Sequence, residues 1–338
     1  MYAIQVAYLL IWRDFLGYLI IQVLCTIGCN LVLNYIACRR YPYLKKLEKI
    51  ASSDVVDKKD LIHNVKATFL YKVSDRILDQ TDSIIISVMF STVIVGYYSN
   101  YYLLVLYLTN FGGIIANGLT ASLGNLNVDG DQEYSYSVFK STMLLFSVFG
   151  TFCTACYACI IQDFVPIWVG SQYLMNYDIV VAILAVFYLR MVTNTVWMYR
   201  AAMGLFKEVQ YTNLAAAGLN IILSVILGKT VGVAGIIIAT AVARLVTSFW
   251  YEGKVVLNKL GHPSREYFIQ QLRDLATAVV VITISMLSCS MVGFNGIPGI
   301  IIKVCICGIW TGVVELIVNG RSDAFRVLTR KVFQGLKK

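Results

Sequence analysis

Apolar residues run along this chain in stretches long enough to cross a lipid bilayer. A membrane-spanning helix needs about 20 mostly apolar residues, and residues 15–37 supply such a stretch without a single charge. Residues 83–128 are also charge-free, over a length that fits the end of one helix, a turn and a second helix. We predict nine complete spans in all. They lie in 15–37, 67–90, the later part of 83–128, 141–162, 175–199, 209–228, 232–251, 275–302 (with a turn at 295–298) and 299–319.

Composition narrows the class of protein further. Of the 338 residues 58% are hydrophobic and 14% are charged, whereas a soluble domain carries about 25% charged residues. These proportions exclude a soluble globular domain and a disordered chain. The sequence therefore predicts an all-α fold, a polytopic membrane helical bundle.

The distribution of basic residues predicts the orientation of the bundle. Alternate connections hold 21 of the 28 lysines and arginines, and those on the opposite side hold two. The positive-inside rule places the basic set in the cytoplasm. It comprises residues 38–66, 123–140, 200–208, 252–273 and 321–338. The net charge of +9 is explained in this way and does not predict binding of nucleic acid.

The longest polar stretch, residues 38–66, divides the chain. Its eight lysines and arginines fit a cytoplasmic anchor and linker. A second interpretation is contact with anionic membrane lipids.

The predicted helix 67–90 carries a stripe of charge. Ionisable groups inside a span are costly and usually face a bundle interior or a watery cavity. At 100° per residue the five charged side chains fit in an arc of about 120°. They are Lys72, Asp75, Arg76, Asp79 and Asp82. Pairing within the helix at i+3 spacing, and snorkelling of the residues nearest the cytoplasm, are the alternatives to a cavity lining.

A second helix, 175–199, carries Arg190 past its middle, with Asn194 and Trp197 on the same face. An arginine flanked by an amide and an indole suits a phosphate or a sugar. The alternative is a structural arginine paired with Asp79 or Asp82 across helices. Both arrangements can occur in different states.

Other polar residues favour structural roles. Arg244 lies about two turns from the cytoplasmic end of its span, where snorkelling is slightly favoured over cavity lining. Arg200, at the end of 175–199, suits an interfacial anchor. Asn110 and Asn117 share one face, and packing between helices is favoured over substrate contact.

Neither a metal site nor an enzyme is expected. Cys153, Cys156 and Cys159 recur in an apolar helix without histidine or acidic partners, which favours packing. The chain contains no P-loop, GxSxG or HExxH motif. The predicted outer connections are short and almost uncharged, so transport is favoured over catalysis, and no cofactor is predicted.

Seven short motifs in a fixed order resemble one transporter family. They are TDSIIIS at 81–87, VGYYSNY at 95–101, SLGNLN at 122–127, IWVG at 167–170, FYLR to WMYR at 187–200, LNIILS at 219–224 and GVAG at 232–235. In this order they resemble the polysaccharide flippases, the Wzx-type lipid-linked oligosaccharide translocases. This family shares a superfamily with the multidrug and toxic-compound exporters.

The resemblance implies two pseudo-symmetric lobes around a central cavity in a bacterial plasma (inner) membrane. The implied cargo is an undecaprenyl-diphosphate-linked oligosaccharide for cell-surface polysaccharide. The implied partners are the polymerase and glycosyltransferases of the same pathway. Arg76, Arg190, Lys72 and Arg244 would contact the anion, alongside Asn194 and Trp197. Asp79, Asp82 and Asp75 would balance these charges or carry a coupling cation.

The resemblance also implies a division of the chain. Residues 1–37 would end the N-terminal lobe, with 38–66 as the inter-lobe loop. Residues 67–251 would form the C-terminal six-helix lobe, followed by two additional helices in 252–319 and a basic cytoplasmic tail in 320–338. Since a lone lobe lacks the second cavity wall, the resemblance does not imply that the chain transports its cargo on its own.

Three other classes remain open. A multidrug exporter would favour acids and aromatics over arginines in its cavity. A membrane polysaccharide polymerase would need a large charged outer loop. A scaffold for a polysaccharide assembly complex would need no transport path.

Overall fold

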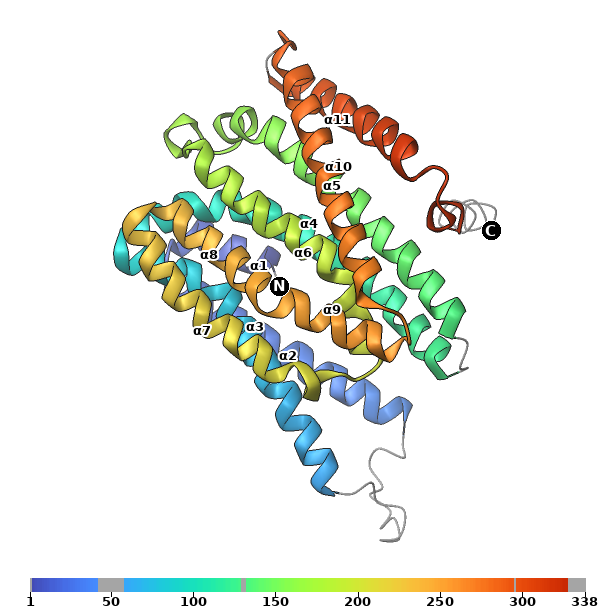
Figure 1. The fold of residues 1–338 in the computed structure, drawn as a ribbon. Helices are drawn as coiled ribbons and strands as arrows, with labels where there is room; N and C mark the ends of the chain where they lie inside the picture. Colours follow the sequence, from blue (N-terminus) through green and yellow to red (C-terminus); the bar gives the residue numbers. More distant parts are fainter. Residues whose placement is uncertain (1, 42–57, 129–131, 295, 328–338) are drawn as a thin grey trace. The chain divides into compact units, whose positions relative to one another are not determined.

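The fold, seen in a computed structural model, is all-helical throughout the part of the chain that the structure describes: residues 2–41, 58–128, 132–294 and 296–327. Figure 1 shows the helices in sequence colours. They are α1 (Tyr2–Trp12), α2 (Phe15–Arg40), α3 (Lys58–Met89), α4 (Thr92–Val128), α5 (Gln132–Trp168), α6 (Tyr177–Ala202), α7 (Phe206–Thr230), α8 (Val233–Val246), α9 (Ser248–Lys259), α10 (Ser264–Ser290) and α11 (Gly296–Asn319), with a 3-10 turn at Ser171–Tyr173.

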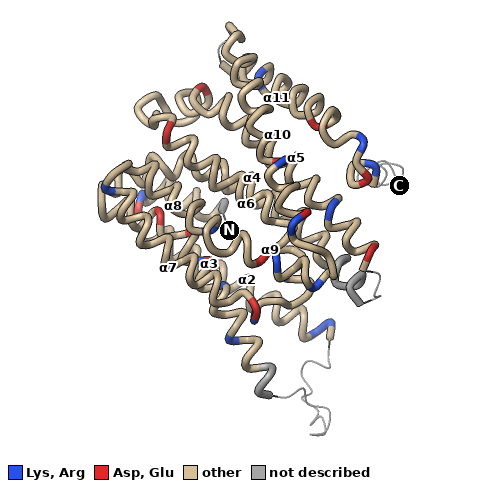
Figure 2. Tube along the Cα trace, in the orientation of Figure 1, with Lys and Arg blue, Asp and Glu red and all other residues tan. Residues whose placement is uncertain are grey.

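Eight of the described helical segments are long and apolar enough to cross a membrane, and α8 and α9 together form one of them. The chain is therefore a multi-pass helical membrane protein. Figure 2 shows the long uncharged stretches of these helices in tan. The predicted count of nine is one too high by this measure, because α3 carries too many charges to qualify.

The chain divides into two compact units, Met1–Leu61 and Ile62–Lys338. In the first unit α1 packs on α2. Asp14 caps α2, since its carboxylate accepts hydrogen bonds from the backbone N–H groups of Leu16 (3.1 Å) and Gly17 (2.8 Å). Packing within this unit buries no described side chain of α2.

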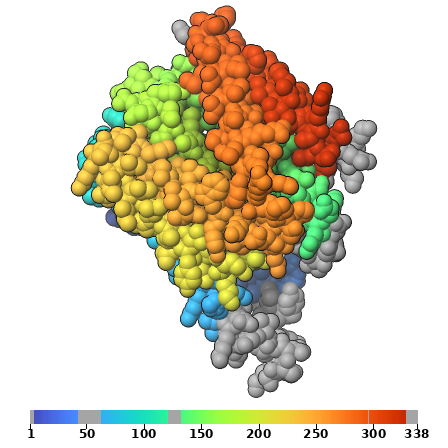
Figure 3. Space-filling model, in the orientation of Figure 1, coloured from blue at the N-terminus to red at the C-terminus, as the bar shows by residue number. Residues whose placement is uncertain are grey.

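The second unit is built around α6, which packs against α4, α5 and α8. Close approach is possible because Gly150 of α5 faces α6: a Cβ there would lie 2.9 Å from the Cβ of Met191. Helices α10 and α11 also pack against α5 and against each other. Figure 3 shows this pair, orange to red, beside the green surface of α5.

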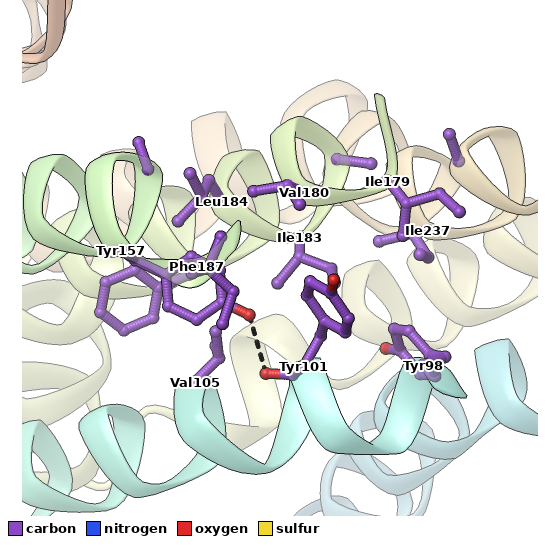
Figure 4. Packing of buried hydrophobic residues seen from close by; sticks show 14 of the residues in the cluster. Tyr98, Tyr101, Val105, Tyr157, Ile179, Val180, Ile183, Leu184, Phe187 and Ile237 are labelled. Carbon is purple, nitrogen blue, oxygen red and sulfur yellow. Dashed lines mark hydrogen bonds between the residues drawn. The ribbon is translucent and has the colours of Figure 1, made fainter. Parts of the chain in front are cut away.

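The largest core joins α4, α5, α6 and α8 (Figure 4). Tyr101 and Phe187 are almost completely buried there. The hydroxyl of Tyr157 donates a hydrogen bond to the backbone carbonyl of Tyr101 (2.9 Å), drawn as the dashed line. Tyrosine can enter this apolar layer because its one polar atom has a partner.

Two predicted connections are mostly helix. Residues 123–128 still belong to α4 and residues 132–140 to α5, while most of 252–273 lies in α9 and α10. The prediction of two connections at these places was wrong. A charged residue marks where an apolar stretch ends, but the helix itself can continue beyond it. Residues 42–57 of the predicted inter-lobe loop and 328–338 of the basic tail lie outside the described residues.

Candidate functional site

A cluster of carboxylates and guanidiniums joins α3, α6 and α8. Arg190 of α6 binds Asp79 of α3 with both terminal nitrogens, at 2.9 Å from Nη1 to Oδ1 and 3.3 Å from Nη2 to Oδ2. Arg244 of α8 donates from Nη2 to Asp75 Oδ1 (3.1 Å) and to Asp79 Oδ1 (3.5 Å). Asp79 is thus shared between two arginines. This is the inter-helix pairing that the sequence left open for Arg190.

The indole of Trp197 lies beside both arginines, with its centroid 6.0 Å from Cζ of Arg190 and 5.3 Å from Cζ of Arg244. The two cations differ in access. The side chain of Arg190 is 27% exposed, whereas that of Arg244 is 7% exposed. Arg244 is therefore buried between carboxylates, and the snorkelling interpretation was wrong.

A cavity of about 460 Å³ opens between α3, α4 and α6. The carboxylate of Asp75 lies in its wall, but most of its polar lining consists of amides and guanidiniums with one indole. These side chains belong to Asn110, Asn117, Arg190, Asn194, Trp197 and Arg200. Asn110 and Asn117 line this space rather than packing between helices, which corrects the favoured sequence interpretation. The wall offers hydrogen-bond donors for anions and both donors and acceptors for hydroxyl groups.

The charged residues of the stripe on α3 do not all face the same environment. Lys72 and Arg76 are exposed, form no ion pair within the described residues and do not line the cavity. On the helical wheel Asp82 lies at one edge of the stripe and Arg76 at the other. Packing buries the edge with Asp82, which is 6% exposed. The structure thus gives no support to Lys72 and Arg76 as cavity cations.

Asp82 enters a separate polar group with α7 and α8. The hydroxyl of Thr240 donates to Asp82, at 2.9 Å from Oδ1. Asn220 donates from Nδ2 to Thr240 Oγ1 (2.9 Å), and the hydroxyl of Ser224 donates to the Ile236 carbonyl (3.4 Å). Asn220 Oδ1 has no hydrogen-bond partner within the described part of the chain. Hydrogen bonds therefore link buried polar side chains from three helices.

A third group, which the sequence did not reveal, surrounds Arg200. Its Nη1 lies 2.5 Å from Glu252 Oε2 of α9 and also donates to the hydroxyl of Tyr71 on α3. The guanidinium stacks over the Tyr71 ring, with Cζ 4.0 Å from the centroid. Arg200 is 6% exposed, so the predicted interfacial role was wrong. No spacing within one helix could have indicated these partners, because they come from two other helices, α3 and α9.

Comparison with known proteins identifies no similar protein. The chain matches no family model, no curated protein and no solved structure.

Proposed function

We propose that the chain is part of a flippase that carries an undecaprenyl-diphosphate-linked oligosaccharide across a bacterial plasma membrane. The observation that carries the proposal is the cavity lined by Arg190, Trp197 and amide side chains. Two chemistries meet there: a partly exposed guanidinium for phosphate, and amides with an indole for sugar. Residues 67–251 would serve as one lobe of the transporter, as the motif order implies.

Arg190 is the proposed contact for the diphosphate. A guanidinium binds carboxylate and phosphate oxygens with the same planar pair of N–H donors. Arg190 already makes that bidentate contact with Asp79. A diphosphate entering the cavity would replace Asp79 as the acceptor. Asp79 would keep Arg244, whose Nη2 lies 3.5 Å from it, so release of Arg190 leaves no isolated carboxylate.

Asp82 is the proposed residue for coupling to an ion gradient. Hard cations take oxygen ligands, and Asp82 and Thr240 offer oxygens in a buried site. Protonation of Asp82 would serve the same purpose. Because α3 carries both Asp79 and Asp82, occupancy at Asp82 can bias the helix that holds Arg190.

An exporter of hydrophobic cations is the second candidate. The acids and tyrosines that such a cargo needs do meet in one hollow, where Asp79, Asp82, Tyr98 and Tyr102 line the wall together with Arg190. That hollow has a volume of about 30 Å³, roughly the space of one water molecule. The larger, arginine-lined cavity therefore favours an anionic head group.

The test is translocation by the full chain in vesicles. A fluorescent isoprenyl-diphosphate-linked sugar is placed in both leaflets, and the fraction accessible to a membrane-impermeant quencher is followed over time. We expect the wild-type chain to accelerate exchange between leaflets and Arg190→Gln to slow it at least tenfold. Arg265→Gln, a change at an exposed arginine of α10, serves as the matched control and should behave as wild type.

A parallel assay measures efflux of a lipophilic cationic dye from the same vesicles. Dye efflux without movement of the lipid-linked sugar would replace the proposal with the exporter. Sugar exchange at the same rate in Arg190→Gln and wild type would remove Arg190 from it. If wild-type vesicles exchange neither probe, the chain has no transport activity on its own.

A further inference from the structure

Three cysteines that are far apart in sequence meet in the second unit. Cys159 of α5, Cys289 of α10 and Cys307 of α11 place their Sγ atoms within 4.8 Å of one another. Cys289 and Cys307 are buried, Cys159 is partly buried, and all three are free thiols. Each helix contributes one sulfur, and the three helices lie side by side (Figures 1 and 3).

The surroundings of this thiol cluster are apolar. Ala155 and Val281 are completely buried in it, and Phe152 and Ile282 pack against them. The candidate ligand group contains no histidine or carboxylate among the described residues. Sulfur-only groups select soft metals such as Cu(I), whereas oxygen-rich groups select Mg²⁺ or Ca²⁺.

We propose that Cys159, Cys289 and Cys307 form a binding site for a single Cu(I) ion. With metal–sulfur bonds of about 2.3 Å, three sulfurs in a trigonal plane lie about 4 Å apart. The separations in this structure, up to 4.8 Å, require only a small inward movement. Zn²⁺ in structural sites is almost always four-coordinate. Cys156 also lies beside the Cys307 thiol, but it is outside the group of sulfurs that lie within 4.8 Å of one another, and those three leave Zn²⁺ one ligand short.

Binding is a proton exchange without electron transfer. The ion enters as Cu(I), each coordinating thiol passes its proton to solvent, and three copper–sulfur bonds form. The product carries negative charge, which is costly in an apolar setting. Lys303, one helical turn before Cys307, would compensate this charge by releasing its partner Asp163, whose side chain is 48% exposed and can be solvated.

Lys303 forms an ion pair with Asp163, which lies one turn after Cys159. The ion pair therefore joins α5 and α11 beside the point where their cysteines meet. The lysine side chain is 14% exposed, so its charge is only partly screened by solvent. A bound ion would fasten α10 and α11 to α5, independently of any role of the cavity around Arg190.

The test is a Cu(I) titration of the purified full chain in detergent, under anaerobic conditions with ascorbate and a competing chelator. We expect one Cu(I) per chain. Cys159→Ser, Cys289→Ser and Cys307→Ser should each weaken binding at least about 100-fold, more than loss of an outer-shell partner costs. Cys305→Ser is the matched control, since Cys305 is exposed on the same helix as Cys307, and it should bind as wild type.

X-ray absorption on the wild-type complex gives a second measurement that needs no variant. We expect three sulfur neighbours at about 2.3 Å and no nitrogen or oxygen. Equal copper retention by wild type and the three serine variants would overturn the site, as would a first shell of nitrogen or oxygen. Tight Zn²⁺ binding that also requires Cys156, with four sulfurs in the shell, would overturn the assignment to Cu(I).

Discussion

Helix α6 holds two arginines, each paired with a carboxylate on another helix, in two different environments. The side chains of Arg200 and Glu252 are 7% and 2% exposed. Those of Arg190 and Asp79 are 27% and 11% exposed. Arg200 also has the Tyr71 hydroxyl and ring as partners. Among the described residues Arg190 forms an ion pair with Asp79 alone, and it lines the cavity.

The difference separates a structural pair from one that can exchange partners. Removing one member of a buried pair leaves an uncompensated charge and costs about 3–5 kcal/mol. A partly exposed pair contributes about 0–1 kcal/mol, because water can replace either partner. We therefore expect the surroundings of Arg200 to determine stability and those of Arg190 to determine ligand binding.

Glu252→Gln should have the largest effect on stability. The substitution keeps the side-chain shape but leaves the Arg200 guanidinium without its carboxylate. We expect the free energy of unfolding in detergent to fall by about 3–5 kcal/mol. Glu208→Gln, at an exposed acid of α7, controls for loss of charge. A change below about 1 kcal/mol in Glu252→Gln would contradict the structural role of this pair.

Asp79→Asn should have an intermediate effect. The substitution weakens the acceptor shared by Arg190 and Arg244, although Arg244 keeps Asp75 at 3.1 Å. Hydrogen bonds to charged groups contribute about 1.5–3 kcal/mol, and we expect a loss in this range. Denaturant unfolding measures it, with Asp75→Asn as the matched variant. A loss of unfolding free energy as large as that of Glu252→Gln would show that the Arg190–Asp79 pair is as structural as the Arg200–Glu252 pair.

Arg190→Gln should have the smallest effect on stability, about 1 kcal/mol or less. Its carboxylate partner keeps Arg244 and is not left alone. The same unfolding experiment measures this change. A large loss of stability would make Arg190 a structural residue and would remove the reason to treat it as a ligand contact.

Much of the fold was predictable because lipid imposes a simple rule on length and polarity. Spans such as 15–37 and 209–228 follow from uncharged stretches of about 20 residues, and α2 and α7 cover them. The extent of α5 was not predictable in this way. Its first turns, from Gln132 to Lys140, are polar yet helical, and polarity alone does not distinguish a helix outside the bilayer from a loop.

The part of the site that lies on a single helix was predictable from the spacing of its polar residues. Arg190, Asn194 and Trp197 share a face of α6 and line one cavity. Partners from other helices were not predictable, because spacing along one helix says nothing about its neighbours. Glu252 beside Arg200 is one example, and the meeting of Cys159 with two distant cysteines is another.

Binding of an isoprenyl diphosphate tests the role of Arg190 most directly. The purified full chain, Arg190→Gln and Asp79→Asn would each be titrated with farnesyl diphosphate, with farnesol as the uncharged control. We predict that Arg190→Gln binds at least tenfold more weakly than wild type, a loss of about 1.4 kcal/mol. We also predict that Asp79→Asn binds more tightly, because the carboxylate at position 79 no longer competes with the diphosphate for the Arg190 guanidinium. Equal affinity of wild type and Arg190→Gln would contradict the assignment of this arginine to the diphosphate.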